Sequence, residues 1–215
     1  MPVSTSKTDN HNVAPKLALR RYFLNKYHSD GSGSVMDCCQ GGGIMWTELR
    51  KTNAIASYWG VDVKPKKGRL KLDSVRILQQ RGWPQDVIDV DTYGSPWKHW
   101  FAIMQNIEKP LTVFLTVGST AFSGSTDKTI LQTIGCVFSK QLPETICGRL
   151  SEFGTSYALA KAADFCTIIE AVESVSDGNA RYFGVRLEPQ KMNGQPLVTA
   201  SRSQHTQSLR EIEHV

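Results

Sequence analysis

One short segment of the sequence has the residue types of a ligand-binding turn. Residues 35–44 read Val-Met-Asp-Cys-Cys-Gln-Gly-Gly-Gly-Ile, so an apolar run ends in Asp37 and three glycines lead into a helical pattern. Glycine lets the backbone approach a ligand because it has no Cβ. The first turn of a helix also offers N–H groups that have no partner within the helix. We therefore predict a ligand at this strand-to-helix turn.

The charge of Asp37 bears on which ligand this is. In a dinucleotide-binding turn the glycines follow the strand directly and their backbone amides meet a pyrophosphate. An anionic side chain at that point would repel the pyrophosphate. A carboxylate is better matched to a cation, such as the sulfonium and amino groups of S-adenosylmethionine. A glycine cluster also occurs in tight turns that bind nothing, so both interpretations stay open for this segment alone.

Alternating apolar segments and helical patterns predict a mostly parallel α/β sheet. The expected strands are residues 34–38, 54–63, 69–73, 86–91 and 111–117, and the expected helices between them are residues 44–52, 74–81 and 98–107. Strands that are separated by helices imply parallel βαβ units with right-handed crossovers. Residues 167–175 and 181–187 flank a turn-rich joint, which predicts a β-hairpin at the end of the domain.

Three further acids close apolar segments in the same way as Asp37. Asp62 lies about twenty residues beyond the glycines, which is the spacing of an acid that accepts hydrogen bonds from ribose hydroxyls. Asp73 could accept from an adenine amino group or could cap the following helix. Asp91 ends the fourth expected strand. All four acids should lie along the carboxyl edge of one sheet, where ligands bind.

The composition indicates one soluble globular domain with polar ends. Of the 215 residues, 40% are apolar and 21% are charged, and no signal-peptide or membrane-spanning pattern occurs, so we expect a cytoplasmic protein. Residues 1–15 are expected to be disordered, 16–188 to form the domain, and 189–215 to form a polar tail. The net charge of +5 is compatible with a nucleic-acid partner but is too small to require one. Five cysteines without a C-x-x-C pair argue against a disulfide framework and a zinc site.

Several smaller features complete the pattern. Residues 16–27 should form a helix with Arg20, Arg21 and Lys26 pointing outward. The basic residues 64–69 form either a solvated turn or a nucleic-acid contact. The remaining expectations are a loop at 118–126, acting as a lid or a surface connection, and helices at 128–140, 143–150 and 156–165.

Together, these segments resemble the class I S-adenosylmethionine-dependent methyltransferases, whose seven-stranded sheet ends in such a hairpin. The resemblance covers roughly residues 17–187. It implies that Asp37, Gly41 and Gly43 hold the methionine part of S-adenosylmethionine and that Asp62 holds the ribose. It also implies, less securely, that Asp73 and Ser74 contact the adenine.

Residues 91–96, Asp-Thr-Tyr-Gly-Ser-Pro, are similar to the fourth motif of amino-group methyltransferases (D/N-P-P-Y/F). They are most similar to the D-P-F/Y-G-T/S-P stretch of the tRNA guanine-26 N2-dimethyltransferase group. This implies methyl transfer to an exocyclic amine of a nucleobase in RNA or DNA. Asp91 would accept from the amine, Tyr93 would stack on the base, and Pro96 would stiffen the loop.

Two departures from the family pattern keep other functions open. Thr92 stands where the motif has proline, and the large carboxyl-terminal domain of the tRNA enzymes is absent from this sequence. Thr92 and the unusual segment 38–40 favour a catalytically silent methyltransferase-like domain that binds cofactor or nucleic acid as a regulator or subunit. A nicotinamide-dependent oxidoreductase would share the glycine turn and Asp62 but would leave Asp37 and the hairpin unexplained. His99 is expected to pack in its helix rather than to do chemistry.

Overall fold

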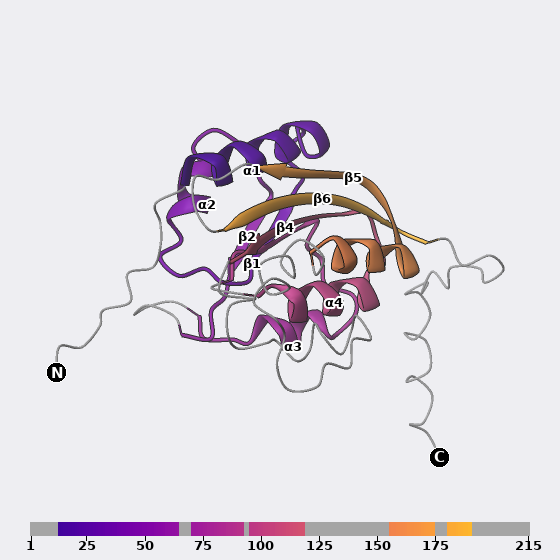
Figure 1. Ribbon diagram of the computed structural model, residues 1–215. Helices are drawn as coiled ribbons and strands as arrows, with labels where there is room; N and C mark the ends of the chain where they lie inside the picture. The colour runs from indigo at the N-terminus through magenta and orange to yellow at the C-terminus, as the bar shows by residue number, and fades with distance from the viewer. Residues whose placement is uncertain (1–12, 65–69, 93–94, 119–154, 175–179, 191–215) are drawn as a thin grey trace, which may run out of the picture.

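The computed structural model describes residues 13–64, 70–92, 95–118, 155–174 and 180–190. Its centre is a six-stranded sheet in the order β2-β1-β3-β4-β6-β5. The strands are β1 (Ser34–Asp37), β2 (Ser57–Gly60), β3 (Val87–Val90), β4 (Leu111–Val117), β5 (Cys166–Ser174) and β6 (Arg181–Pro189). The helices are α1 (Val13–Tyr27), α2 (Ile44–Leu49), α3 (Ser74–Leu78), α4 (Trp97–Asn106) and the 3-10 helix η2 (Lys161–Asp164). Figure 1 shows α1 and α2 on one face of this sheet and α3 and α4 on the other.

The strand directions follow the predicted pattern. β1 pairs in parallel with β2 and β3, and β3 pairs in parallel with β4. β6 runs antiparallel to both β4 and β5, which confirms the terminal hairpin. β4 is buried at every position, as expected of a central strand that is covered on both faces.

The expected third strand at residues 69–73 does not form. In its place a single parallel bridge joins Asp62 to Lys71, so the described part of the sheet has six strands and not seven. Parallel neighbours need a crossover of a dozen or more residues, and only residues 61–70 connect β2 to this segment. The connection is therefore too short to hold a covering helix, and β2 remains at the edge of the sheet.

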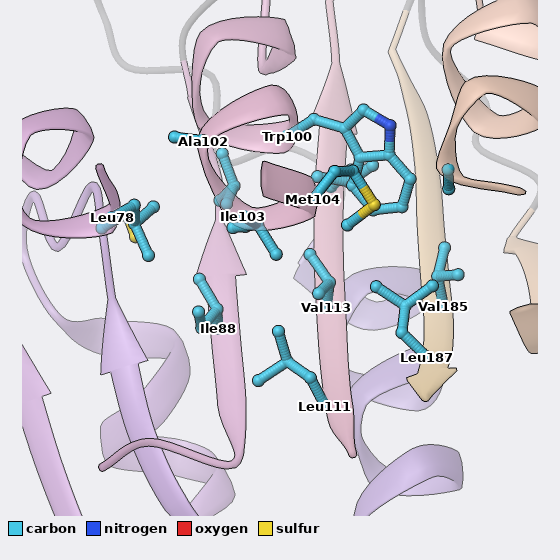
Figure 2. Close-up of a cluster of buried hydrophobic side chains, with 14 of the residues drawn as sticks. Leu78, Ile88, Trp100, Ala102, Ile103, Met104, Leu111, Val113, Val185 and Leu187 are labelled. Atoms are coloured by element: carbon cyan, nitrogen blue, oxygen red, sulfur yellow. The ribbon is translucent and has the colours of Figure 1, made fainter. Parts of the chain in front are cut away.

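Each face of the sheet has its own apolar core. On the α3 and α4 face, Ile88 and Val113 from the strands pack with Trp100, Ile103 and other side chains of the cluster in Figure 2. The opposite face is covered by α1 and α2. There Gly184 of β6 leaves room for the ring of Phe23, because a Cβ at this position would overlap that ring. These two cores hold α1 and α4 firmly against the sheet.

Polar contacts also fasten α1 to the hairpin. Glu170 of β5 accepts hydrogen bonds from the Tyr22 hydroxyl at 2.7 Å, the Lys26 ammonium at 2.8 Å and the Tyr27 hydroxyl at 2.8 Å. All three donors lie in the carboxyl-terminal half of α1, so these contacts fix where that half lies over the sheet.

Several expected segments lie wholly or largely outside the described residues. They are the ends 1–12 and 191–215, the loop 118–126, the helices 128–140 and 143–150, and the turn 176–180. The expected helix at 156–165 is present as a helical segment at residues 155–160 followed by η2.

Candidate functional site

The parallel strands bring three of the predicted acids to one edge of the sheet. Asp37 is the last residue of β1, Asp62 follows two residues after β2, and Asp91 directly follows β3. Asp37 also lies opposite Asp89 in the register of β1 and β3, so the side chains of these two residues share one face of the sheet. The carboxyl edge is therefore strongly acidic.

The glycine turn is bonded directly to the acid that follows β2. Gly41 and Gly43 have φ angles of 49° and 64°, a region that glycine occupies without a steric penalty. The Gly41 N–H donates to Asp62 Oδ2 at 3.0 Å, and the Lys64 N–H donates to Asp62 Oδ1 at 2.8 Å. Gly43 then caps α2. Asp62 thus holds the turn that carries both glycines.

The hydrogen bonds that Asp37 accepts come from uncharged donors. Asp37 is only 5% exposed and accepts a hydrogen bond from the Tyr58 hydroxyl at 2.8 Å. The Cys39 N–H lies 3.3 Å from its other oxygen. Burial and the nearby charge of Asp89 raise the pKa of Asp37 to about 7, although these two hydrogen bonds oppose the rise. A bound cation would favour the ionised form.

The thiols beside Asp37 are not activated. Burial, together with the neighbouring acids, raises the pKa of both Cys38 and Cys39 above the ordinary thiol value. Nucleophilic cysteines need a lowered pKa, so these two side chains fill space beside the turn.

The residues predicted to contact adenine already have partners within the protein. Asp73 caps α3 by accepting from the Val75 N–H at 3.0 Å, which is the capping role predicted as one of its alternatives. The Ser74 hydroxyl donates to the Cys38 carbonyl oxygen at 3.0 Å and lies 2.8 Å from His99 Nε2. Because Ser74 has one proton to donate, His99 Nε2 must carry the proton of the second hydrogen bond.

This arrangement fixes the state of His99. Burial lowers its pKa to about 4, so the imidazole is neutral at physiological pH. Its Nδ1 is then an acceptor, and it has no hydrogen-bond partner among the described residues. His99 joins α4 to α3 and is not poised as an acid catalyst.

Asp91 forms an ion pair that the sequence analysis did not predict. Lys16 Nζ of α1 lies 2.7 Å and 2.9 Å from its two carboxylate oxygens. Burial alone would raise the pKa of Asp91, but the charges of Lys16 and Arg20 outweigh that effect and lower it. Asp91 is therefore held in its ionised form.

The prediction that Arg20 points outward is wrong. Its guanidinium is buried and donates to both oxygens of Asp89, with Nε–Oδ2 and Nη2–Oδ1 distances of 2.7 Å and 2.6 Å. Trp46 Nε1 of α2 donates to the same carboxylate at 2.7 Å. Lys16 and Arg20 are four residues apart on one helix, so both point toward the sheet from the same side of α1.

The segment after Asp91 is only partly described. Tyr93 and Gly94 lie outside the described residues. Pro96 is buried at the amino end of α4 with a φ angle of −85°, so it fixes the point where the loop becomes a helix. The Thr92 hydroxyl lies 3.5 Å from the Thr116 carbonyl oxygen, on neighbouring β4.

Four functional candidates were absent from the sequence prediction: Lys16, Arg20, Tyr58 and Asp89. A signal for the buried pair was present, since Asp89 interrupts the apolar strand 87–90. A buried carboxylate nearly always has a cationic or hydrogen-bonding partner. The sequence did not indicate which cation this would be.

The described residues contain no group of three or more His, Cys, Asp or Glu side chains that could hold a metal ion. None of the helices among them is long and apolar enough to cross a membrane.

Comparisons with known proteins identify the fold. No protein-family model and no curated protein sequence matches the chain. Among solved structures, Trm1 from Pyrococcus horikoshii in complex with S-adenosylmethionine matches with a TM-score of 0.57 and 16% identity. This chain has the methyltransferase fold. The match covers 81% of this chain but only 56% of Trm1, so the chain spans just over half of that enzyme's length.

A second methyltransferase structure has the same fold over most of its length. The plantazolicin methyltransferase BamL, in complex with a triazolic desmethylPZN analog and SAH, matches with a TM-score of 0.52 and 9% identity. The match covers 84% of this chain and 87% of BamL. At these identities the similarity establishes the fold alone. Among the described residues, the bridge between Asp62 and Lys71 is the only pairing beyond β2 at this edge of the sheet.

Proposed function

We propose that this chain is an S-adenosylmethionine-dependent methyltransferase that acts on an exocyclic amine of a nucleobase in RNA or DNA. The observation that supports this most strongly is the linked group of Asp37, the glycine turn and Asp62 on a methyltransferase fold. A ligand can come close to the backbone of the glycine turn, and a buried carboxylate lies beside that turn. This combination suits a ligand that is cationic at one end and carries a ribose.

Each part of the cofactor has a candidate partner. Asp37 would attract the cationic methionine end, while the turn at Gly41 and Gly43 gives it room. Asp62 has accepted one backbone N–H on each oxygen, and a carboxylate has about four lone-pair positions, so it could still accept from ribose hydroxyls. The adenine would lie near Asp73 and Ser74.

The reaction would be an in-line displacement in which S-adenosylmethionine supplies the methyl group. The C–S bond breaks as the N–C bond forms, and the amine later releases a proton. The protein's main contribution would be to position the amine. Asp91 would accept an N–H of the amine as positive charge develops on nitrogen. Lys16 keeps this carboxylate ionised.

The target base must leave the double helix of the nucleic acid to reach this site, because the amine of a paired and stacked base is inaccessible. Tyr93 would stack on the unpaired base. Pro96, buried at the start of α4, would hold the loop that carries Tyr93.

A second function is favoured by the ion pair at Asp91. Lys16 Nζ already contacts both carboxylate oxygens, so the amine would have to share Asp91 with an ammonium group or displace it. Thr92 also replaces the proline of the family motif. Both features would suit a catalytically silent domain that binds cofactor or nucleic acid as a regulator or subunit.

Substitution of Asp91 separates the two functions. For an enzyme, Asp91→Ala should reduce methyl transfer from radiolabelled S-adenosylmethionine to RNA or DNA by about a hundredfold to a thousandfold. Its cofactor affinity should stay close to that of the unaltered protein. Asp164→Ala, a change at an exposed acid far along the chain, is the matched control. Cofactor binding without any methyl transfer by the unaltered protein would instead establish the silent domain.

A further inference from the structure

A cleft of about 680 Å³ lies beside the edge strand β2, on the α3 and α4 face of the sheet. It is bounded by β2, α3 and the segment that leads from α3 to β3. Of the described residues that are assigned to the cofactor or to catalysis, only Asp73 reaches its wall. The cleft therefore begins beside the cofactor edge and extends away from it.

The floor of this cleft combines aromatic surface with one unsatisfied acceptor. Trp59 of β2 and Ile77 of α3 are partly buried, and Trp83 is buried beside them. Gln85 is only 6% exposed and also lines the cleft. Its Oε1 has no hydrogen-bond partner in the described part of the chain. Buried acceptors are almost always paired, so this oxygen indicates a ligand with an N–H or O–H donor and a flat apolar body.

The rim of the cleft is basic. Lys71, Arg76 and Arg81 are exposed along it, and Asp73 is the single acid among the described residues that line the cleft. Arg76 Nε lies 3.6 Å from Asp73 Oδ2 and forms an ion pair with it. Lys71 and Arg81 have no ion-pair partner among the described residues. This charge complements an anionic ligand, and exposed arginines are suited to phosphate groups.

We propose that this cleft binds an unpaired nucleotide of a single-stranded nucleic acid. The base stacks against Trp59, and Gln85 turns its buried Oε1 into the cleft to accept an N–H from the base, while Arg76 and Arg81 contact the flanking phosphates. Every nucleobase has a π face and an N–H donor, so this mode of binding tolerates different sequences. The cleft thereby gives the strand a second attachment, beyond the proposed methyl-transfer site, that does not require the cofactor.

Binding can be measured by fluorescence anisotropy of a labelled single-stranded RNA of about twelve nucleotides, without S-adenosylmethionine. The unaltered protein should bind the strand, and the double charge reversal Arg76→Glu with Arg81→Glu should weaken binding at least about tenfold. Lys51→Glu is the matched control, because Lys51 is exposed just after α2 on the other face of the sheet. It should change the affinity less than about twofold.

Two further variants test the floor. Trp59→Leu should weaken strand binding by about fivefold to a hundredfold through lost stacking, whereas Trp59→Phe should retain most of the affinity. Gln85→Met removes the acceptor at similar volume and should weaken binding several-fold. Thermal unfolding of each variant shows whether it is folded, and the exposed arginine variants provide the test if a floor variant is not.

Three results would overturn the proposal. They are no binding of the strand, an equal loss of affinity in the Lys51→Glu control, and equal affinity for an acidic peptide or for a free mononucleotide. Cofactor titration of the same variants separates this proposal from the proposed function. The arginine variants should bind S-adenosylmethionine as the unaltered protein does, and failure of the unaltered protein to bind it would leave the strand result standing.

Discussion

The two halves of the acidic sheet edge hold their carboxylates in opposite ways. At the β1 and β2 half, Asp37 and Asp62 accept hydrogen bonds only from uncharged donors, namely a tyrosine hydroxyl and backbone amides of the described residues. At the β3 half, Asp89 and Asp91 are paired with two cations of α1. Neither carboxylate of the first half has an ion-pair partner among the described residues, so both can attract a cationic ligand. The second half is neutralised within the protein.

This difference assigns a distinct role to α1. The helix is held over the sheet by its apolar face and by Glu170, and it delivers both cations to the strand that carries the proposed catalytic acid. Substitutions in α1 should therefore affect stability and catalysis, whereas substitutions around Asp37 should affect cofactor binding.

The largest expected effect is the loss of the buried pair. Arg20→Met leaves Asp89 buried without its cation, which should lower the free energy of unfolding by about 3 to 5 kcal/mol. Urea unfolding measures this change. The control Lys51→Met removes an exposed lysine that is paired with Glu48 and should cost less than about 1 kcal/mol. A loss below about 1 kcal/mol for Arg20→Met would show that the pair does not anchor α1.

Removal of the charge at Asp37 should have the second largest effect. Asp37→Asn should weaken S-adenosylmethionine binding by about tenfold to a hundredfold, because a hydrogen bond to a charged group contributes about 1.5 to 3 kcal/mol. The protein itself should become no less stable, since burial already disfavours the ionised carboxylate. Calorimetric titration gives the affinity, with the exposed Asp164→Asn as control. Unchanged affinity for Asp37→Asn would remove Asp37 from the site.

The glycine turn provides a closely matched pair of variants. Gly41 and Gly82 both have positive φ angles, of 49° and 75°, and a Cβ added at either position would meet no close neighbour. Replacement of either glycine by alanine should cost about 1 to 2 kcal/mol of stability through backbone strain alone. Only Gly41→Ala should also weaken cofactor binding. If both variants bind cofactor equally well, the turn is not part of the site.

The smallest expected effect concerns the pH dependence of catalysis. The charge of Lys16 helps to lower the pKa of Asp91, so Lys16→Met should raise that pKa. Asp91 would then lose its charge at a higher pH, and the acid limb of the pH–rate profile should move upward. The control Lys26→Met removes the ion-pair partner of Glu170 and should leave the acid limb of the pH–rate profile unchanged. An acid limb that does not respond to Lys16→Met would contradict the proposed role of Asp91.

Local pattern was enough to predict most of the sheet. The uniformly apolar strand at 111–117 and the two segments of the hairpin were recognisable because strand length and apolar content are local properties. Residues 69–73 also alternate like a strand. They failed to form one because the connection before them is too short, which is a property of the chain's topology.

The candidate site also has a part that local pattern predicts and a part that depends on how the chain folds back on itself. The positions of Asp37, Asp62 and Asp91 followed from the rule that parallel strands end at one edge. The partners of Asp89 and Asp91 depended on how α1 lies across the sheet, and no periodicity in residues 16–27 distinguishes Arg20 from an outward-facing arginine. The acid Asp89 inside an apolar strand was the one sign of a buried cation in this segment, and the sequence prediction did not use it.

The most direct test of the cofactor site is calorimetric titration of the full chain with S-adenosylmethionine at about pH 7.5 and about pH 6, with NADH for comparison. The sulfonium compound should bind and NADH should not. Because the pKa of Asp37 is raised to about 7, this carboxylate takes up a proton as the pH falls, and affinity should decrease by about fivefold to tenfold at the lower pH. Binding of NADH but not of S-adenosylmethionine, or an affinity that does not depend on pH, would contradict the assignment of Asp37 as the partner of a cationic cofactor.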